Sequence, residues 1–314
     1  MKNPTPFPEE PPCNNGGQVA GSMELWGPRK GFRLGGSGPT ALNTLDPYSG
    51  NSQSEALGLN NAGMAAGWAT RGNGVRRATL WKAGSSQSWD MGTLKSAQLP
   101  PAQEQLLYSS AMGIQPNGNK IVGASINPNN VIRGFILDYN ESPNYLEIRV
   151  DLSVAMDIGS IACNPESGSE IRAINQIGEH VGAAAVRNGQ YHAFIRPSYE
   201  MQDCGFTDLG VLSSVNSSGT TVWGTSSIAM GVNGHCVVVG SAHEPLTGSS
   251  GAFVWRKGWP QLRRLDELVY PTTPGWQLKE AYGVNDSGMI VGWGYYNGIP
   301  RGFAAVPGSP PPGD

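Results

Sequence analysis

The sequence predicts an all-β fold, a β-propeller of four-stranded blades, and three observations support this prediction. A short Gly-rich unit recurs six times along the 314 residues. Glycine accounts for 44 residues, about twice its usual share of ~7%, which suits short strands joined by tight turns. No segment sustains a 3.6-residue apolar period, and Gly or Pro interrupts every candidate helix.

The first part of each unit is predicted to be a β-hairpin. Five copies follow the pattern Asn-x-x-Gly-x-x-x-Gly, in which Cys236 once replaces the middle Gly. The Asn side chain accepts a local backbone hydrogen bond, and the middle Gly takes the positive φ that other residues resist. The second Gly, as at Gly123 and Gly292, allows neighbouring backbone to come close. The copies begin at Asn14, Asn60, Gln115 (with one extra residue), Asn175, Asn233 and Asn285.

Two further strands are expected after each hairpin. The third strand is marked by a small residue followed by an apolar or β-branched one, at Phe32, Thr79, Phe135, Phe194, Phe253 and Phe303. A fourth strand in five copies carries a recurring aspartate, at Asp46, Asp90, Asp151, Asp208 and Asp266. Four strands in each copy of 46 to 60 residues match one propeller blade of about 40–50 residues.

Six blades are predicted within one repeat domain, residues 13–306, flanked by a Pro-rich tail (1–12) and a Pro/Gly tail (307–314). The first copy lacks a clear first strand and the last copy lacks a fourth, and propeller rings commonly close by joining strands from both termini. Five blades are the alternative, because residues 41–306 can be divided into five units that each begin with the Asp-Leu strand. That division leaves residues 14–34 as an extra hairpin.

The repeat resembles the bacterial extracellular HAF-repeat family over residues 13–306. The His-Ala-Phe of that family stands here as His192-Ala193-Phe194, and its DLGTL element is echoed by MGTL from Met91 and by DLGVL from Asp208. The resemblance implies a secreted or cell-surface protein and carries over no catalytic residue. The first residues hold Pro and Glu where a signal peptide would be apolar, so we expect a mature region, the alternative being a protein that is not exported.

Charge and cysteine content argue against several partner classes. Lys and Arg total 21 against 24 acidic residues, a formal charge of −3, so no nucleic-acid partner is predicted. No apolar run reaches the ~18 residues of a membrane span. Neither a metal site nor a cofactor is predicted, because no CxxC pair or zinc-type His spacing occurs. The pairing of Cys13, Cys163, Cys204 and Cys236 stays open: Cys163–Cys204 is the first pair to test, and four free thiols are the alternative.

Candidate ligand-binding residues lie in the variable loops that join the second and third strands. Trp68 and Trp293 directly follow the second Gly, and Tyr295 and Tyr296 extend the aromatic surface of the last copy. Exposed aromatic rings beside Asn and Arg suit stacking on sugar rings, although packing between blades is the alternative. Two arginines, Arg133 and Arg301, belong to a column of cations that precedes the third-strand Phe or Thr by two positions, together with Lys30, Arg77 and His192.

The cation column and the recurring aspartates each allow two interpretations. The cations either bind anionic groups such as uronate or phosphate, or pair with the aspartate of the neighbouring fourth strand. The aspartates suggest glycosidic chemistry only if two carboxyl groups lie roughly 5–10 Å apart, which equivalent positions in different blades do not provide. Capping of turns by these aspartates is therefore the preferred interpretation.

Together these features favour a monomeric, non-catalytic extracellular or surface binding module, with a glycan as the expected ligand and a protein surface as the other possible partner. A carbohydrate-active hydrolase or lyase on a propeller scaffold is one alternative, and a structural surface protein without a small ligand is another. No G-x-S-x-G elbow, phosphate loop or H-E-x-x-H motif is present, which favours binding over catalysis without deciding between them.

Overall fold

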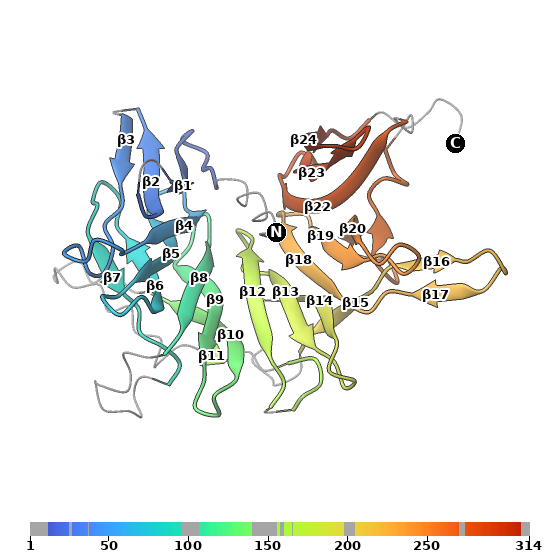
Figure 1. Ribbon diagram of the computed structural model, residues 1–314, viewed down its shortest axis with the longest axis horizontal. Helices are drawn as coiled ribbons and strands as arrows, with labels where there is room; N and C mark the ends of the chain where they lie inside the picture. The colour runs from blue at the N-terminus through green and yellow to red at the C-terminus, as the bar shows by residue number, and fades with distance from the viewer. Residues whose placement is uncertain are drawn as a thin grey trace. The chain divides into compact units, whose positions relative to one another are not determined.

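The computed structural model describes residues 12–24, 27–36, 38–95, 107–139, 156–157, 160–164, 166–197, 205–269 and 274–308. These residues form strands and loops, with no α-helix among them, and the prediction of an all-β fold is confirmed. Six antiparallel sheets of three or four strands correspond to the six predicted copies, and one two-stranded hairpin is added (Figure 1). Within the described part no helix is available to cross a membrane.

The chain divides into two compact units, which are described separately. The first comprises residues 1–128 and 136–155, and the second comprises residues 129–135 and 156–314, so the division falls within one strand, β10. The prediction of a single domain over residues 13–306 stays a prediction.

The first three sheets follow the predicted order of strands. The first sheet contains β1 (Val19–Met23), β2 (Lys30–Gly35) and β3 (Gly38–Ala41). The second contains β4 (Ser54–Leu59), β5 (Ala65–Thr70), β6 (Arg76–Trp81) and β7 (Ser88–Asp90). The third contains β8 (Ser109–Ile114), β9 (Lys120–Ile126), β10 (Ile132–Asp138) and β11 (Met156–Asp157).

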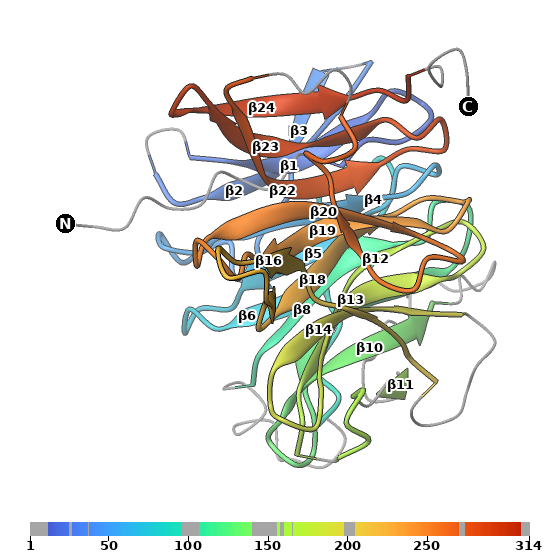
Figure 2. The ribbon, with the colours of Figure 1, turned by 90° about the vertical axis from the view of Figure 1, so that its right-hand side faces the viewer.

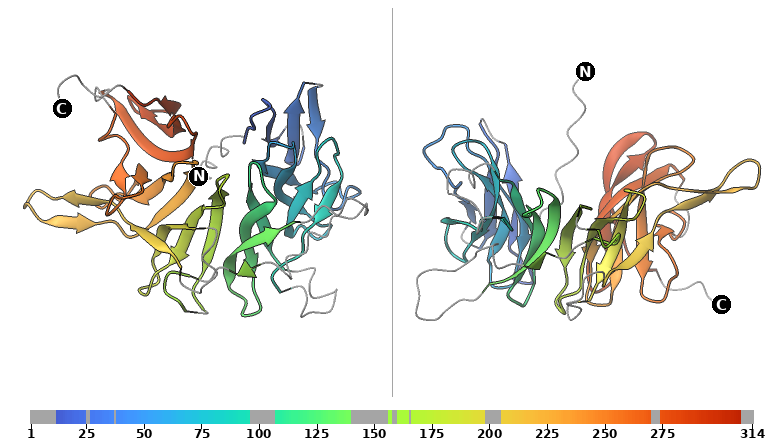
Figure 3. Two further views of the ribbon diagram at one scale, coloured as in Figure 1. Left: turned by 180° about the vertical axis from the view of Figure 1, so that it is seen from behind. Right: turned by 90° about the horizontal axis from the view of Figure 1, so that it is seen from below.

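The second unit continues the same pattern and adds the hairpin. Its first sheet contains β12 (Ser169–Ile174), β13 (His180–Ala185), β14 (Tyr191–Arg196) and β15 (Thr207–Gly210). The hairpin of β16 (Ser213–Val215) and β17 (Thr221–Trp223) follows and projects from the rest of this unit (Figures 1 and 3). The fifth sheet contains β18 (Ser227–Val232), β19 (Val237–His243), β20 (Ser250–Arg256) and β21 (Arg263–Arg264). The sixth contains β22 (Trp276–Val284), β23 (Ile290–Tyr296) and β24 (Ile299–Ala305).

The pairing of the fourth strand shows how each copy is built. Strand β7 pairs with β6, β15 with β14 and β21 with β20, so the Asp-Leu strand completes the sheet of its own copy. These sheets therefore do not follow the five-unit alternative, in which the Asp-Leu strand would be the first strand of each unit. Among the described residues the first sheet has no first strand of the pattern and the sixth has no fourth, as predicted.

In the five sheets that have a first strand, the second Gly of the hairpin faces a bulge in that strand. A Cβ atom added to Gly67, Gly182, Gly240 or Gly292 would lie 2.0 Å from a carbonyl oxygen of that strand. The register of the first strand shifts opposite these glycines, for example between Ala56 and Gly58. No side chain fits there, which confirms that this position is Gly because backbone comes close.

The hairpin turns confirm the expected role of the middle Gly. Gly63, Gly178 and Gly288 have φ values of 83°, 88° and 82°. Cys236 adopts the same left-handed conformation with φ 58°, although it carries a side chain. An L-residue with a Cβ is disfavoured in this region, so Cys236 is a strained member of the series.

The leading Asn of each hairpin does more than form its own turn, because its amide nitrogen also reaches the next sheet. Asn14 Nδ2 donates to the backbone oxygen of Asn60 at 2.8 Å. Asn175 donates in the same way to Asn233, and Asn233 to Asn285, each at 2.9 Å. The repeated Asn thus links the turns of successive sheets within each unit, a role that the turn chemistry alone does not predict.

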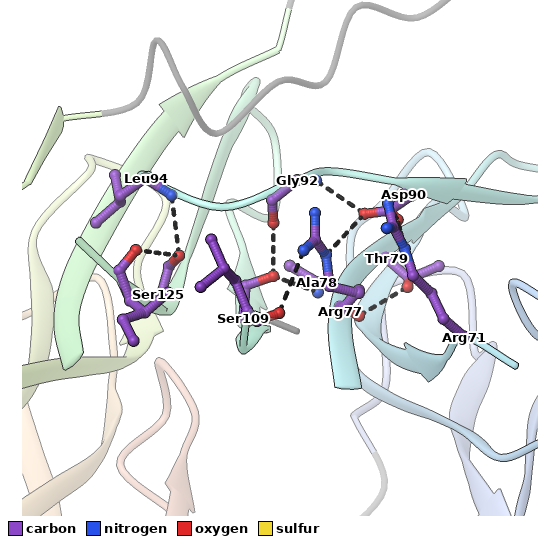
Figure 4. Close-up of polar contacts among 11 residues, drawn as sticks. Arg71, Arg77, Ala78, Thr79, Asp90, Gly92, Leu94, Ser109 and Ser125 are labelled. Carbon is purple, nitrogen blue, oxygen red and sulfur yellow. Dashed lines mark hydrogen bonds and ion pairs between the residues drawn. The ribbon is translucent and has the colours of Figure 1, made fainter. Parts of the chain in front are cut away.

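A buried serine at the start of the first strand forms a second link between successive sheets. Ser109 Oγ accepts from the Ala78 backbone N–H at 2.9 Å and donates to the Gly92 oxygen at 2.6 Å (Figure 4). Ser227 repeats both bonds with the backbone of Ala193 and Gly210, at 2.8 and 2.5 Å. Because these serines are at most 3% exposed, their hydroxyl groups satisfy backbone groups that would otherwise be buried unpaired.

Candidate functional site

The second unit contains a pocket of about 550 Å³ formed mainly at the loops that join second and third strands. Three copies contribute to it. Ile132 and Tyr191, from the third and fourth copies, stand at the starts of β10 and β14, and the fifth copy supplies residues of the segment 243–250 around the β19–β20 loop. The starts of β12 and β18 complete the wall. These are the loops in which the sequence predicted a ligand site. The lining residues are Ile132, Ser169, Glu170, Ala183, Tyr191, Ser226, Ser227, Ile228, Ser241, Ala242, His243, Gly248, Ser249 and Ser250.

Serine hydroxyl groups dominate the polar part of this pocket. Ser169 and Ser227 already bond to backbone N–H groups of the preceding sheet. Ser226, Ser241 and Ser250 have no side-chain hydrogen bond with any other described residue, so their hydroxyls remain available. A hydroxyl both donates and accepts, which matches the hydroxyl groups of a sugar.

His243 presents one ring nitrogen for a ligand. The Thr225 backbone N–H donates to His243 Nδ1 at 3.3 Å, so Nδ1 acts as the acceptor. The proton of the neutral ring is therefore carried by Nε2. His243 thus adds an N–H donor to the hydroxyl groups of the wall.

Glu170 is the one carboxylate among the described residues that line the pocket. Its Oε1 accepts from Arg172 Nε at 3.0 Å and forms an ion pair with Nη2 at 2.9 Å. Both side chains are about a quarter exposed, with values of 25% for Glu170 and 27% for Arg172. Glu170 is therefore an oriented acceptor.

The rim of the pocket carries exposed apolar surface. Tyr191 is 43% exposed and Ile132 is 48% exposed. A Cβ atom on Gly168 would lie 2.2 Å from the Tyr191 hydroxyl, so the absence of a side chain at Gly168 makes room for the tyrosine. An aromatic ring with a polar tip at the mouth of a pocket is suited to cover one face of a sugar.

The hairpin β16–β17 brings a second exposed aromatic residue, Trp223, which is 57% exposed. Two residues after it, Thr225 binds His243, and Ser226 lines the pocket. Glu244 accepts from Ser214 Oγ of β16 at 3.1 Å, which ties the base of the hairpin to the residue after His243. The hairpin is therefore fixed next to the pocket wall.

Trp68, a predicted ligand residue, is 2% exposed. Its Nε1 donates to Glu55 Oε2 at 3.0 Å, and the Arg76 guanidinium lies 3.9 Å from the ring centroid. Both the indole N–H and the ring of Trp68 therefore already have partners within the first unit. The binding role of Trp68 stays a prediction, and this burial speaks against it.

The predicted aromatic residues of the last copy lie on β23. Trp293 and Tyr295 are half-buried, with ring centroids 5.6 Å apart. Tyr296 is 42% exposed and its ring lies 5.3 Å from that of Trp276. The six predicted residues, Trp68, Trp293, Tyr295, Tyr296, Arg133 and Arg301, are all absent from the pocket lining.

The two predicted arginines differ in their surroundings. Arg133 is 4% exposed and donates from Nη2 to the Asn164 backbone oxygen at 2.8 Å. The aspartate of its own copy, Asp151, lies outside the described residues. Arg301 is exposed on β24.

Two of the other three cations of the column, Arg77 and His192, pair with the aspartate of the fourth strand, whereas Lys30 Nζ donates to the Ser52 backbone oxygen at 2.7 Å. Arg77 Nε lies 3.3 Å from Asp90 Oδ1, and His192 Nδ1 lies 3.0 Å from Asp208 Oδ2. Both aspartates also cap their turns, as predicted: Asp90 accepts from Gly92 N–H at 2.9 Å (Figure 4), and Asp208 accepts from the N–H two residues on at 2.8 Å. Burial alone would raise the pKa of Asp208, but the bonds from His192 and from the turn lower it below its ordinary value.

The cysteines are in two states. Cys163 is disulfide-bonded, whereas Cys13 and Cys236 are free thiols, so the alternative of four free thiols is wrong. Cys204, the predicted partner of Cys163, lies outside the described residues. Among the described residues no group of three His, Cys, Asp or Glu side chains is placed to hold a metal ion.

Sequence reasoning missed most of the pocket. It identified the loops that hold Tyr191 and His243, but neither residue was singled out as a ligand group. Ser226, Ser241 and Ser250 carry no local signature, since serine is common in loops of this chain. The one available signal was the segment VNSSGTTVW from Val215 to Trp223, whose alternating pattern around Ser-Gly indicates an additional hairpin.

Comparison with known proteins gives similarity in structure only, since no family model matches the chain and no curated protein shows significant similarity. The putative TolB from Agrobacterium tumefaciens superposes with a TM-score of 0.50 at 12% identity, covering 96% of this chain and 90% of that one. TolB from Acinetobacter baumannii gives 0.45 at 11% identity and covers 81% of this chain, which spans 55% of that protein. A mutant of Aleuria aurantia lectin in complex with alpha-methyl-L-fucoside gives 0.38 at 12% identity, covering 96% of each chain.

Of these three, the Agrobacterium structure bears on the fold. TolB proteins contain a β-propeller, and the similarity extends over nearly the whole of this chain. Together with the six small antiparallel sheets, it supports a propeller-like fold. At these identities the comparison does not extend to ligands or activity.

Proposed function

We propose that this protein is a non-catalytic binding module and that the pocket of the second unit binds a glycan. The observation that carries the proposal is the composition of that pocket. Three available serine hydroxyls and a histidine N–H donor line a cavity whose other wall residues include Ile132, Ala183 and Ile228. Sugars present the same combination, hydroxyl groups around a ring with apolar faces.

Each group has a defined task in this proposal. Ser241 is 7% exposed and bonds a sugar hydroxyl at the inner wall, while Ser226 and Ser250 do so near the mouth. His243 Nε2 donates to a sugar oxygen, and Glu170 accepts from a second hydroxyl. The Tyr191 ring covers an apolar face of the sugar. Ser241, His243 and Ser250 stand on strands β19 and β20, so these groups need little reordering when a sugar binds.

The carboxylate arrangement favours binding over hydrolysis. A glycosidase uses two carboxyl groups on the same site, roughly 5–10 Å apart. Among the described lining residues Glu170 supplies one carboxyl group, and its Oε1 is held in an ion pair with Arg172 Nη2 at 2.9 Å. The hydrolase or lyase alternative therefore needs a second group from elsewhere in the chain.

We further propose that the six sheets are six blades of one propeller and that the chain works as a monomer in a secreted or cell-surface setting. The match between six sequence copies and six sheets supports the blade number. The resemblance to HAF repeats supports the location, and the disulfide at Cys163 fits an oxidising compartment.

A glycan-array screen tests the proposed function. The full chain is compared with Ser226→Trp, which places a large side chain at an exposed position of the pocket wall. The matched control is Ser218→Trp, also exposed but in the turn of the β16–β17 hairpin and outside the pocket. We expect a small set of related glycans to bind the parent and the control but not Ser226→Trp. Absence of binding to every glycan, or equal binding by Ser226→Trp, would contradict the proposal.

A further inference from the structure

The last sheet ends in an edge strand, β24, on which no other described strand lies (Figure 2). Three other sheets of the pattern continue with a fully described fourth strand, β7, β15 or β21, at this place. Gly302 and Ala304 of β24 are exposed, whereas the equivalent Ala193 and Ile195 of β14 are 0% and 6% exposed. The backbone of β24 is thus an open template for one more strand.

The sheet of β12–β15 shows what a fourth strand supplies. Strand β15 places Asp208 opposite Phe194 of β14, where the carboxylate bonds His192 two residues earlier. Phe206, two residues before Asp208, packs edge-on against Phe194 with ring centroids 4.8 Å apart. Two side chains of the incoming strand, spaced aromatic-x-Asp, therefore complete this face of the sheet.

The cation of the last copy lacks the carboxylate that its equivalents have. Arg301 precedes Phe303 by two residues, as His192 precedes Phe194. His192 and Arg77 each bond the aspartate of the fourth strand. The Arg301 side chain is exposed and has no hydrogen bond or ion pair with any described residue.

The aromatic position of the last copy is also open. Phe194 is 0% exposed, but Phe303 is only half-buried. A groove of about 650 Å³ runs beside it, with apolar walls that include Trp276, Leu278 and Ala305. This groove and Arg301 lie on the same face of the sheet, since residues two apart in a strand share a face.

We propose that β24 binds an extended segment of a partner protein, which adds as a fourth strand and carries an aromatic residue two positions before an aspartate. The aspartate pairs with Arg301, the aromatic side chain fills the groove beside Phe303, and the strand backbone bonds to the edge of β24. The internal template of Phe206 and Asp208 and the unpaired charge on Arg301 together support this occupant. The inference is independent of the glycan pocket.

A binding assay with a synthetic peptide tests this inference on the full chain. The probe is fluorescein-labelled GFTDLGVL, the sequence of residues 205–212, followed by fluorescence anisotropy. We expect saturable binding that Arg301→Gln weakens about two- to fivefold, the range of a partly exposed ion pair. Replacing Phe by Ala in the peptide should weaken binding about tenfold or more, because a buried aromatic side chain is lost.

Controls separate the specific pair from general charge. Arg187→Gln removes an exposed arginine from a different loop of the same unit and should leave binding unchanged. Asn in place of Asp in the peptide should weaken binding to the parent but add nothing to Arg301→Gln, because both changes remove one interaction. Hydrogen exchange should slow at the amides of residues 301–305 when peptide is bound.

Three outcomes would overturn the inference. One is the absence of saturable binding. A second is binding that is indifferent to both Arg301 and the peptide aspartate, or amide protection that falls outside β24. The third is a concentration-dependent dimer of the chain alone that Arg301→Gln abolishes, since the edge would then serve a second copy of this chain.

Discussion

Replacement of Asn233 by Ala removes both the turn bonds and the link to the next sheet. Asn233 is 4% exposed; its Oδ1 accepts from the backbone N–H groups of His235 and Val237, at 3.0 and 2.9 Å. Its Nδ2 donates to the Asn285 oxygen at 2.9 Å. A lost capping side chain costs about 1 kcal/mol, and each buried group left unpaired adds about 1–3 kcal/mol. We expect Asn233→Ala to lower the free energy of unfolding by roughly 2–4 kcal/mol.

Two comparison variants separate the turn from the link. Asn216 accepts from Ser218 and Thr220 N–H at 3.1 and 2.9 Å, the same local pattern, but makes no bond to another described sheet. Asn216→Ala should therefore cost only the turn, about 1 kcal/mol. Asn233→Asp keeps the acceptor oxygens of the turn but sets a carboxylate oxygen against the Asn285 oxygen, so it should cost more than Asn216→Ala even though its turn is kept.

Urea unfolding followed by tryptophan fluorescence measures all three variants, and differential scanning calorimetry supplies Tm. For a chain of 314 residues the expected difference for Asn233→Ala corresponds to a fall in Tm of roughly 3–6 °C. The reasoning would be refuted if Asn233→Ala and Asn216→Ala had equal costs, because the link to Asn285 would then contribute nothing.

Three further predictions concern Cys236 and Asp208. Cys236→Gly should raise the free energy of unfolding, measured by urea titration, by about 1 kcal/mol, because Gly accepts φ 58° without strain. A loss of stability would mean that the contact of Cys236 with Glu179 outweighs the strain. Burial and the Glu179 carboxylate raise the pKa of Cys236 to about 11. Glu179→Gln should therefore speed the reaction of the Cys236 thiol with a disulfide reagent at pH 8 by about tenfold, and an unchanged rate would contradict this. Since the pKa of Asp208 is below its ordinary value of 3.8, its stabilisation is complete above that pH and is lost as the pH falls further. The difference in stability between the parent and Asp208→Asn should therefore be constant from pH 5 to 6 and shrink below pH 3.8, and a difference that persists in strong acid would be inconsistent with the pair.

The strands were predictable because each repeat contains the turn residues and glycines that its hairpin requires. Gly63 and Gly178 occupy turns that need positive φ, and Gly67 sits where a Cβ atom would strike a carbonyl oxygen. These are local requirements, and six copies repeat them. The pairing of Arg77 with Asp90 was predictable for the same reason, since third and fourth strands are neighbours.

The links between sheets and the pocket were not predictable in the same way. Asn233 and Ser227 satisfy their local roles, and nothing in the sequence shows that each also bonds the next or the preceding sheet. Trp68 and Trp293 occupy equivalent positions, yet Glu55 and Arg76 bury the first while the second stays partly exposed. The pocket combines residues from three copies, so its composition depends on the packing of the copies rather than on any one loop.

The central claim is that the pocket lined by Ser241 and His243 holds a sugar. The most direct test is a crystal structure of the full chain soaked with the glycan that binds best on the array. The account predicts a sugar ring between Tyr191 and the serine wall, with hydroxyl groups within hydrogen-bond distance of Ser241 Oγ and His243 Nε2. A sugar bound elsewhere, for example against Trp293, with this pocket unoccupied, would contradict it.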